Sequence, residues 1–145
     1  ASGVAVVWVG ELPSTGISGC ARWLSDTKAV IGLTLRYKTD DQMWFTFFHE
    51  AGHLVLHDKK AIFLEGKDRP SSKEEEEANA FAARVLIPQE FQAALMGVRL
   101  EAREIIRFAR RVGVAPGIVV GQLQHHGRLK QHQLNSLKRR FKWSE

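Results

Sequence analysis

The sequence of 145 residues contains a single cysteine, Cys20, and no long apolar run. One cysteine excludes an internal disulfide framework and a zinc site made of several thiolates. A membrane span needs about 20 consecutive apolar residues, so the sequence excludes one. The N-terminal segment also lacks the basic lead and the long apolar stretch of a signal peptide. We therefore expect a protein of the reducing cytoplasm that has no membrane partner.

The composition is typical of one globular domain. Hydrophobic residues make up 44% of the chain and charged residues 26%, and this length is enough to bury a core. We expect residues 1–145 to form one domain, in which residues 1–98 hold a sheet and the first helices and residues 99–145 form a basic helical portion. The abrupt start, with small residues directly before an apolar strand, suggests a fragment of a longer chain.

The net charge of +5 is distributed unevenly. Residues 1–98 hold 10 basic and 13 acidic side chains, a net charge of −3, whereas residues 99–145 hold 11 basic and 3 acidic ones, a net charge of +8. A basic portion can contact nucleic acid. Here five of the 11 basic residues follow helical spacing, which is typical of the solvated face of a helix. We therefore do not expect nucleic acid as a partner of this domain. The arginines with that spacing are Arg99, Arg103, Arg107, Arg110 and Arg111.

Strands are predicted only in the first third of the chain. The β-branched run VAVVWVG, residues 4–10, indicates a buried strand, and the alternation in residues 29–37 indicates a second one. A short strand around Trp23 would lie between them. Proline and several glycines in residues 11–21 indicate a loop.

Segments with helical sequence patterns follow the predicted strands. Thr39 to Gln42 form a capping box, so a helix should begin at Asp40 and run to about His57. A second capping-box pattern, Ser71 to Glu74, begins a helix that ends near Leu86 because Pro88 stops it. Further helices are predicted at residues 88–95, 102–112, 116–124 and 132–141. The expected fold is α+β: a small N-terminal β-sheet packed on a helical bundle.

The first predicted helix contains the motif HExxH, as His49, Glu50 and His53. Residues four apart lie on one face of a helix, so both imidazoles can reach a single metal ion. Glu50 is rotated by about 100° from His49, outside the coordination shell but within reach of an activated water. A metal ion would explain two histidines in a segment that otherwise has the composition of a core.

A third ligand is expected from the acidic run of residues 74–77. Helical spacing places Glu77 on a polar stripe, where it should face water, and Glu74 is committed to the capping box. Glu75 shares a stripe with small apolar residues and is the expected ligand, with Glu76 as the alternative.

Two further polar residues lie near these positions. Asn79, one turn after Glu75, could accept a hydrogen bond from the second nitrogen of a ligating histidine; the alternative is a polar residue at a helix–helix contact. His57 shares the stripe of His49 and His53, but we expect it to cap the C-terminal end of its helix.

HEAGHLVLH followed by EEEANAFAARVLIP resembles the ImmA/IrrE family of metallopeptidases, whose members carry HExGHxLLH and then ExxANxFAxxLLxP. The resemblance extends to the strand before the first helix and to VGVAPGIVVGQLQHHG, so it covers nearly the whole chain. The family usually has asparagine where Thr34 stands. The matching residues are His49, Glu50, Gly52, His53, Leu54, Leu56, His57, Glu75, Ala78, Asn79, Phe81, Ala82, Leu86 and Pro88.

The resemblance implies a gluzincin-like zinc site, with His49, His53 and Glu75 as ligands and Glu50 as the catalytic carboxylate. It also implies a cytoplasmic, site-specific protease whose protein substrate is a helix-turn-helix repressor. We accordingly predict a zinc-dependent endopeptidase, with manganese as the alternative metal. The alternative function is a non-catalytic, metal-binding regulatory or sensor domain of a transcriptional regulator or toxin–antitoxin system.

Overall fold

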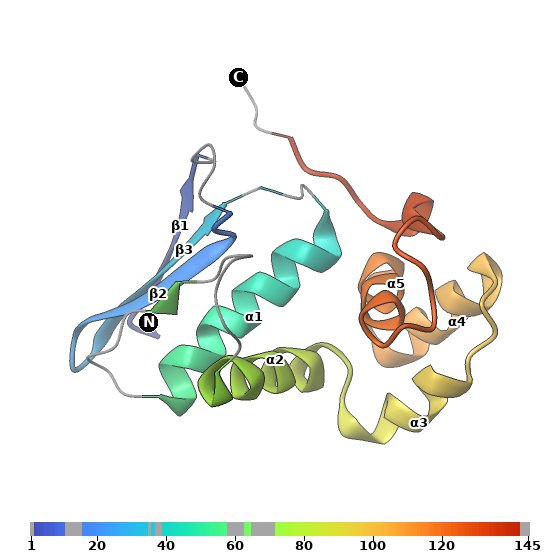
Figure 1. The fold of residues 1–145 in the computed structure, drawn as a ribbon, viewed down its shortest axis with the longest axis horizontal. Coiled ribbons are helices and arrows are strands. Elements are labelled where there is room, and N and C mark those ends of the chain that lie inside the picture. Colours follow the sequence, from blue (N-terminus) through green and yellow to red (C-terminus); the bar gives the residue numbers. More distant parts are fainter. Residues whose placement is uncertain are drawn as a thin grey trace. The chain divides into compact units, whose positions relative to one another are not determined.

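The structure is a computed structural model that describes residues 2–10, 16–34, 36, 39–57, 63–64 and 72–142. Three strands come first, and apart from the two-residue strand β4 the rest of the described elements are helical, so the α+β class predicted from the sequence is confirmed (Figure 1). The elements are β1 (Val4–Val9), β2 (Gly19–Ser25), β3 (Lys28–Thr34), α1 (Asp40–Leu56), β4 (Phe63–Leu64), α2 (Lys73–Leu86), α3 (Gln89–Gly97), α4 (Ala102–Val112), α5 (Pro116–His125) and the 3-10 turn η1 (Asn135–Leu137).

The chain forms two compact units. The first unit combines Ala1–Tyr37 with Phe45–Ala82, and the second combines Lys38–Trp44 with Ala83–Glu145. Both α1 and α2 therefore begin in one unit and end in the other. None of the described helices is both long and apolar enough to cross a bilayer.

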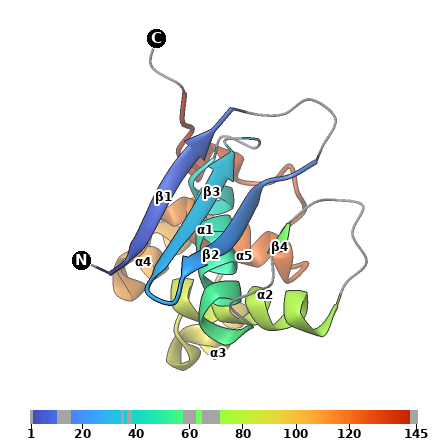
Figure 2. The ribbon, with the colours of Figure 1, turned by 90° about the vertical axis from the view of Figure 1, so that its left-hand side faces the viewer.

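The sheet of the first unit has the strand order β1-β3-β2-β4 (Figure 2). β1 runs parallel to β3, and β2 is antiparallel to both β3 and β4. Three strands differ from the prediction: β1 was expected to be buried but is exposed along its whole length, β2 is longer than the short strand expected around Trp23, and β4 was not expected. Gly19 and Cys20 look like loop residues locally, but they pair with Leu33 and Gly32 of β3, and this cross-strand pairing overrides their weak strand propensity.

The sheet packs against α1. The buried core joins residues of the two central strands, among them Ala21, Ile31 and Leu33, to Leu54 of the helix. Phe47, half-buried, lies beside them. Residues 47 and 54 are seven apart, two helical turns, so they present one apolar stripe to the sheet. The first unit thus fixes the orientation of α1 over the sheet.

The N-terminal turn of α1 is anchored within the second unit. The helix begins at Asp40, as predicted, and both Asp40 and Asp41 are buried. A Cβ added to Gly117 of α5 would lie 2.4 Å from Asp40 Oδ1, so only glycine allows this close packing. Asp41 forms a buried ion pair with Lys138 at 2.8 Å.

The rest of the second unit is helical. Leu95, Ile105 and Leu123, from α3, α4 and α5, are fully buried. Arg103, Arg107 and Arg110 are exposed on α4, as expected of a solvated helix face. The predicted helix over residues 132–141 is wrong, because the described chain there contains only the turn η1.

Candidate metal centre

The HExxH sequence lies within α1, which presents both histidines on one face. His49 and His53 are each only 1% exposed. Their Nε2 atoms are 3.0 Å apart, and their ring centroids are 4.7 Å apart. The spacing of four residues brings the rings together, as helix geometry requires.

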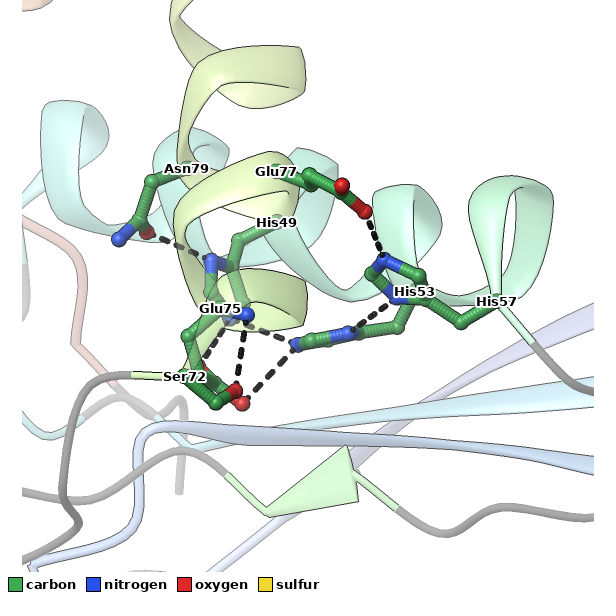
Figure 3. Close-up of polar contacts among 7 residues, drawn as sticks. All are labelled: His49, His53, His57, Ser72, Glu75, Glu77 and Asn79. Carbon is green, nitrogen blue, oxygen red and sulfur yellow. Dashed lines mark hydrogen bonds and ion pairs between the residues drawn. The ribbon is translucent and has the colours of Figure 1, made fainter.

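Glu75 reaches these histidines from α2 (Figure 3). Its Oε2 atom lies 3.3 Å from His49 Nε2, and its Oε1 atom lies 3.4 Å from His53 Nε2. Ser72 caps α2, because its Oγ accepts the backbone N–H of Glu75 at 3.3 Å. The cap is thus one residue later than the predicted Ser71, which lies outside the described residues.

Gly52 allows α2 to pass close to α1. A Cβ at this position would lie 3.3 Å from Ala78 Cα and 3.1 Å from Phe81 Cδ1. These distances are tighter than ordinary van der Waals contact, so a larger residue would push α2 away. The glycine of the motif and the small residue on α2 together set the depth at which Glu75 meets the histidines.

The three donor atoms fit a tetrahedral cation. Metal–ligand bonds of about 2.05 Å imply donor–donor distances of about 3.3 Å in a tetrahedron, and the observed separations are 3.0, 3.3 and 3.4 Å. His49, His53 and Glu75 form a group that could hold a metal ion. Glu76, the alternative ligand, is exposed on α2 and does not belong to this group.

The second ring nitrogens show which way the lone pairs face. His49 Nδ1 lies 2.8 Å from Asn79 Oδ1, so His49 donates this hydrogen bond and leaves its Nε2 lone pair directed at the site. The contact between a histidine and Asn79 that the sequence predicts is therefore present. This hydrogen bond joins α1 to α2 through two residues that are 30 positions apart in the sequence.

His57 directly follows α1, and its backbone N–H donates to the carbonyl of His53 at 3.1 Å, as at a helix C-terminus. Its ring has a further role, because both ring nitrogens have side-chain partners. Its Nδ1 lies 3.0 Å from His53 Nδ1, and its Nε2 lies 3.0 Å from Glu77 Oε2. Glu77 faces water in part, as expected, with 43% of its side chain exposed, but it also contacts His57 and lies 3.8 Å from Lys73. Two features of the sequence could have indicated these contacts: a third histidine four residues after His53, and a carboxylate two residues after Glu75.

Glu50, the proposed catalytic carboxylate, is completely buried on α1. It packs against the first residue of β2: a Cβ added to Gly19 would lie 3.0 Å from Glu50 Cγ and 3.1 Å from its Oε1. Burial removes Glu50 from bulk water, so its position is determined by the helix and by the strand beside it.

The sequence leaves the group that stabilises the oxyanion unassigned, with Tyr37, His125 and His126 as candidates. Tyr37 lies outside the described residues. His125 and His126 are exposed at the end of α5, in the second unit. Partial desolvation of the ring, with a smaller contribution from His125, lowers the pKa of His126 below its ordinary value.

Two helical histidines, a carboxylate from a second helix and a buried glutamate after the first histidine are the arrangement that the HExxH motif of metallopeptidases requires. Residues 7–124 match the peptidase M78 family, described as the IrrE N-terminal-like domain, and the chain belongs to this family of metallopeptidases. The resemblance seen in the sequence is confirmed by this match. No curated protein matches the chain.

Proposed function

We propose that this protein is a zinc-dependent endopeptidase of the gluzincin type, with His49, His53 and Glu75 as the metal ligands. The observation that carries the proposal is the triangle of donor atoms, whose sides of 3.0, 3.3 and 3.4 Å match a tetrahedral ion. Three protein ligands leave one position free for water, as in catalytic rather than structural zinc sites.

The metal ion, Glu50 and Asn79 each have a separate role in the proposed reaction. When bound, the cation supplies Lewis-acid chemistry, which polarises a peptide carbonyl and acidifies water. Glu50 is the general base: it takes a proton from water and later gives it to the nitrogen of the leaving amine. Asn79 holds the His49 ring so that its Nε2 faces the site. A purely structural metal site has no use for a carboxylate at position 50.

The donor set favours zinc over other divalent ions. Two imidazole nitrogens and one carboxylate oxygen suit zinc, whereas manganese prefers sites richer in oxygen. Manganese remains the alternative ion, and metal analysis of the purified protein distinguishes the two.

The proposed substrate is a helix-turn-helix repressor, cut at a specific site in the cytoplasm. The family resemblance supports this substrate class, and the single cysteine, Cys20, fits a reducing compartment. Cleavage would remove a transcriptional repressor, which makes the enzyme a regulatory protease.

The test is to incubate the zinc-loaded protein with purified helix-turn-helix repressors as candidate substrates. We expect one cut, abolished by a chelator and restored by zinc. Glu50→Gln should keep the metal, because Glu50 is not a ligand, and should reduce cleavage by at least about 100-fold, which is the range for loss of a general base. Glu74→Gln, an equal change of charge at an exposed position, should leave cleavage unchanged.

Two results would contradict the proposal. Cleavage by Glu50→Gln at the wild-type rate would remove the role given to this residue. Stoichiometric zinc binding without cleavage of any of these repressors or of an unfolded protein such as casein would favour the alternative, a non-catalytic metal-binding regulatory domain.

A further inference from the structure

The two histidines of the proposed zinc site are held at their second nitrogens by different groups. His49 donates to an amide oxygen, that of Asn79. His53 instead faces another imidazole, because its Nδ1 lies 3.0 Å from His57 Nδ1. That second imidazole faces Glu77, at 3.0 Å from Oε2 (Figure 3). In the hydrogen-bonded series His53–His57–Glu77, only one arrangement of protons lets His53 bind a metal through Nε2.

The proton positions follow from donor and acceptor chemistry. A metal at Nε2 of His53 requires a bare lone pair there, so the proton of this neutral ring is on Nδ1. His53 then donates to His57 Nδ1, which must be bare to accept. The remaining proton of His57 is therefore on Nε2, and it is donated to the carboxylate of Glu77. Each ring nitrogen of His53 and His57 is therefore assigned as a donor, an acceptor or a metal ligand, and the Glu77 carboxylate is the final acceptor.

Burial makes these roles specific. The His57 side chain is 4% exposed, so water does not compete freely for its nitrogens, whereas Glu77 is 43% exposed and keeps its charge solvated. A charged acceptor strengthens the hydrogen bond it receives. It also favours the Nε2–H tautomer of His57, which is the tautomer that His53 needs.

We propose that His57 and Glu77 are positioning residues, which hold His53 in the tautomer and orientation that bind the metal. This inference rests on the proposed function of the site as a zinc centre. α2 would then act on His53 at both ends of the ring, through Glu75 at Nε2 and through Glu77 by way of His57 at Nδ1. Glu77, two residues after a metal ligand, belongs to the site although it does not contact the metal.

The first test measures zinc affinity by competition with a chromophoric chelator. His57→Phe keeps a ring of similar size but removes both nitrogens, and we expect it to weaken zinc binding by about 10- to 100-fold, as for other residues that orient ligands. His57→Asn should recover part of the loss, because its Oδ1 can accept near the position of Nδ1. Circular dichroism and thermal unfolding of the metal-free variants check that each is folded.

The second helix offers a matched series. Glu77→Leu removes the acceptor and should weaken zinc binding, whereas Glu77→Gln keeps an acceptor oxygen and should weaken it less. Glu74→Gln removes the same charge from an exposed position of α2, so it controls for long-range electrostatics. Lys73→Gln removes the lysine that lies 3.8 Å from Glu77 and should leave affinity unchanged.

Nuclear magnetic resonance of histidine ring nitrogens tests the tautomer directly. In the zinc-loaded wild type, His57 should be protonated at Nε2 and bare at Nδ1. In Glu77→Leu the Nε2–H preference should weaken. A purely structural packing role for His57 would leave its tautomer independent of Glu77.

The outcomes separate this inference from the proposed function. If the wild type binds no zinc, the metal-site proposal itself fails. If the wild type binds zinc and folded His57→Phe and Glu77→Leu bind it within about twofold of the wild type, the site stands and the positioning role is wrong. Zinc-loaded wild type with His57 protonated at Nδ1 would also overturn the role.

Discussion

At the scale of single residues, Gly19 shows how a missing side chain can shape a site. It is the first residue of β2, and it lies against α1 where Glu50 is buried. A Cβ there would lie 2.6 Å from Thr46 Cγ2 and 3.0 Å from Glu50 Cγ. The contact with Thr46 is shorter than real Cβ atoms show, and the contact with Glu50 is tighter than most real ones, so the helix side chains would have to shift.

Gly19→Ala should therefore impair the reaction more than metal binding. The added methyl group displaces Glu50 from its position, and small misplacements of a catalytic group cost about 10- to 100-fold in rate. Zinc affinity should stay within about twofold, because the atoms nearest the added methyl group belong to Thr46 and Glu50 and not to a metal ligand. The measurements are the cleavage rate and the zinc affinity of the same preparation.

Gly10→Ala is the matched control, since a Cβ at Gly10 meets no atom of the described residues within 4 Å. Gly10→Ala should leave the cleavage rate and the zinc affinity unchanged. Equal losses of rate and affinity in Gly19→Ala would show that the substitution disturbs the whole site rather than Glu50.

The residues of the site differ in how well the sequence reveals them. His49 and His53 are predictable because helix geometry is local, and their proximity follows from a spacing of four. Glu75 and Asn79 required the periodicity of a second helix and the assumption that it packs against the first. His57 was assigned to a helix cap, because its partner Glu77 is 20 residues away and nothing local identifies it.

At the scale of elements, the cap of α2 connects helix stability to the site. Ser72 accepts the N–H of Glu75, so the cap holds the residue that reaches the histidines. Ser72→Ala should lower the free energy of unfolding by about 1 kcal/mol, the usual cost of losing a side-chain cap. It should also weaken zinc binding, because the first turn of α2 frays and Glu75 loses its fixed position.

Chemical denaturation and chelator competition measure the two effects. Ser136→Ala, at an exposed serine, is the control and should change neither. Ser72→Asp, in contrast to Ser72→Ala, should keep the cap, since aspartate is an equally good N-cap residue. Loss of stability with full zinc affinity would show that Glu75 is held by packing alone.

The helices were predictable where apolar residues recur with the helical period, and α1, α4 and α5 begin where the sequence places them. The predicted helix at residues 132–141 failed because side chains distant in sequence compete with the helix. Gln124 donates from Nε2 to the carbonyls of Gln131 and Gln133, and Leu134 adopts a left-handed conformation at φ 56°. These contacts hold the backbone in another path, which propensity does not register.

At the scale of the whole molecule, metal binding should be a source of folding stability. The donor atoms come from α1 and α2, so an unfolded chain cannot present them together, and binding favours the folded state. At a free zinc concentration of about 100 times the dissociation constant, the gain is about 2.7 kcal/mol. For a chain of this length that corresponds to a rise in melting temperature of about 5–10 °C.

Thermal unfolding with zinc and with chelator measures this gain, and two variants show where it arises. Glu50→Gln should keep the full shift, because Glu50 is not a ligand, whereas Glu75→Gln should lose most of it by weakening the charged ligand. The shift should also grow with the logarithm of free zinc, as required for a ligand that binds only the folded protein. A melting temperature independent of zinc, in a protein shown to bind it, would mean that the ion also binds the unfolded chain with similar affinity. A shift of equal size in Glu75→Gln would place the ion outside the triangle of His49, His53 and Glu75.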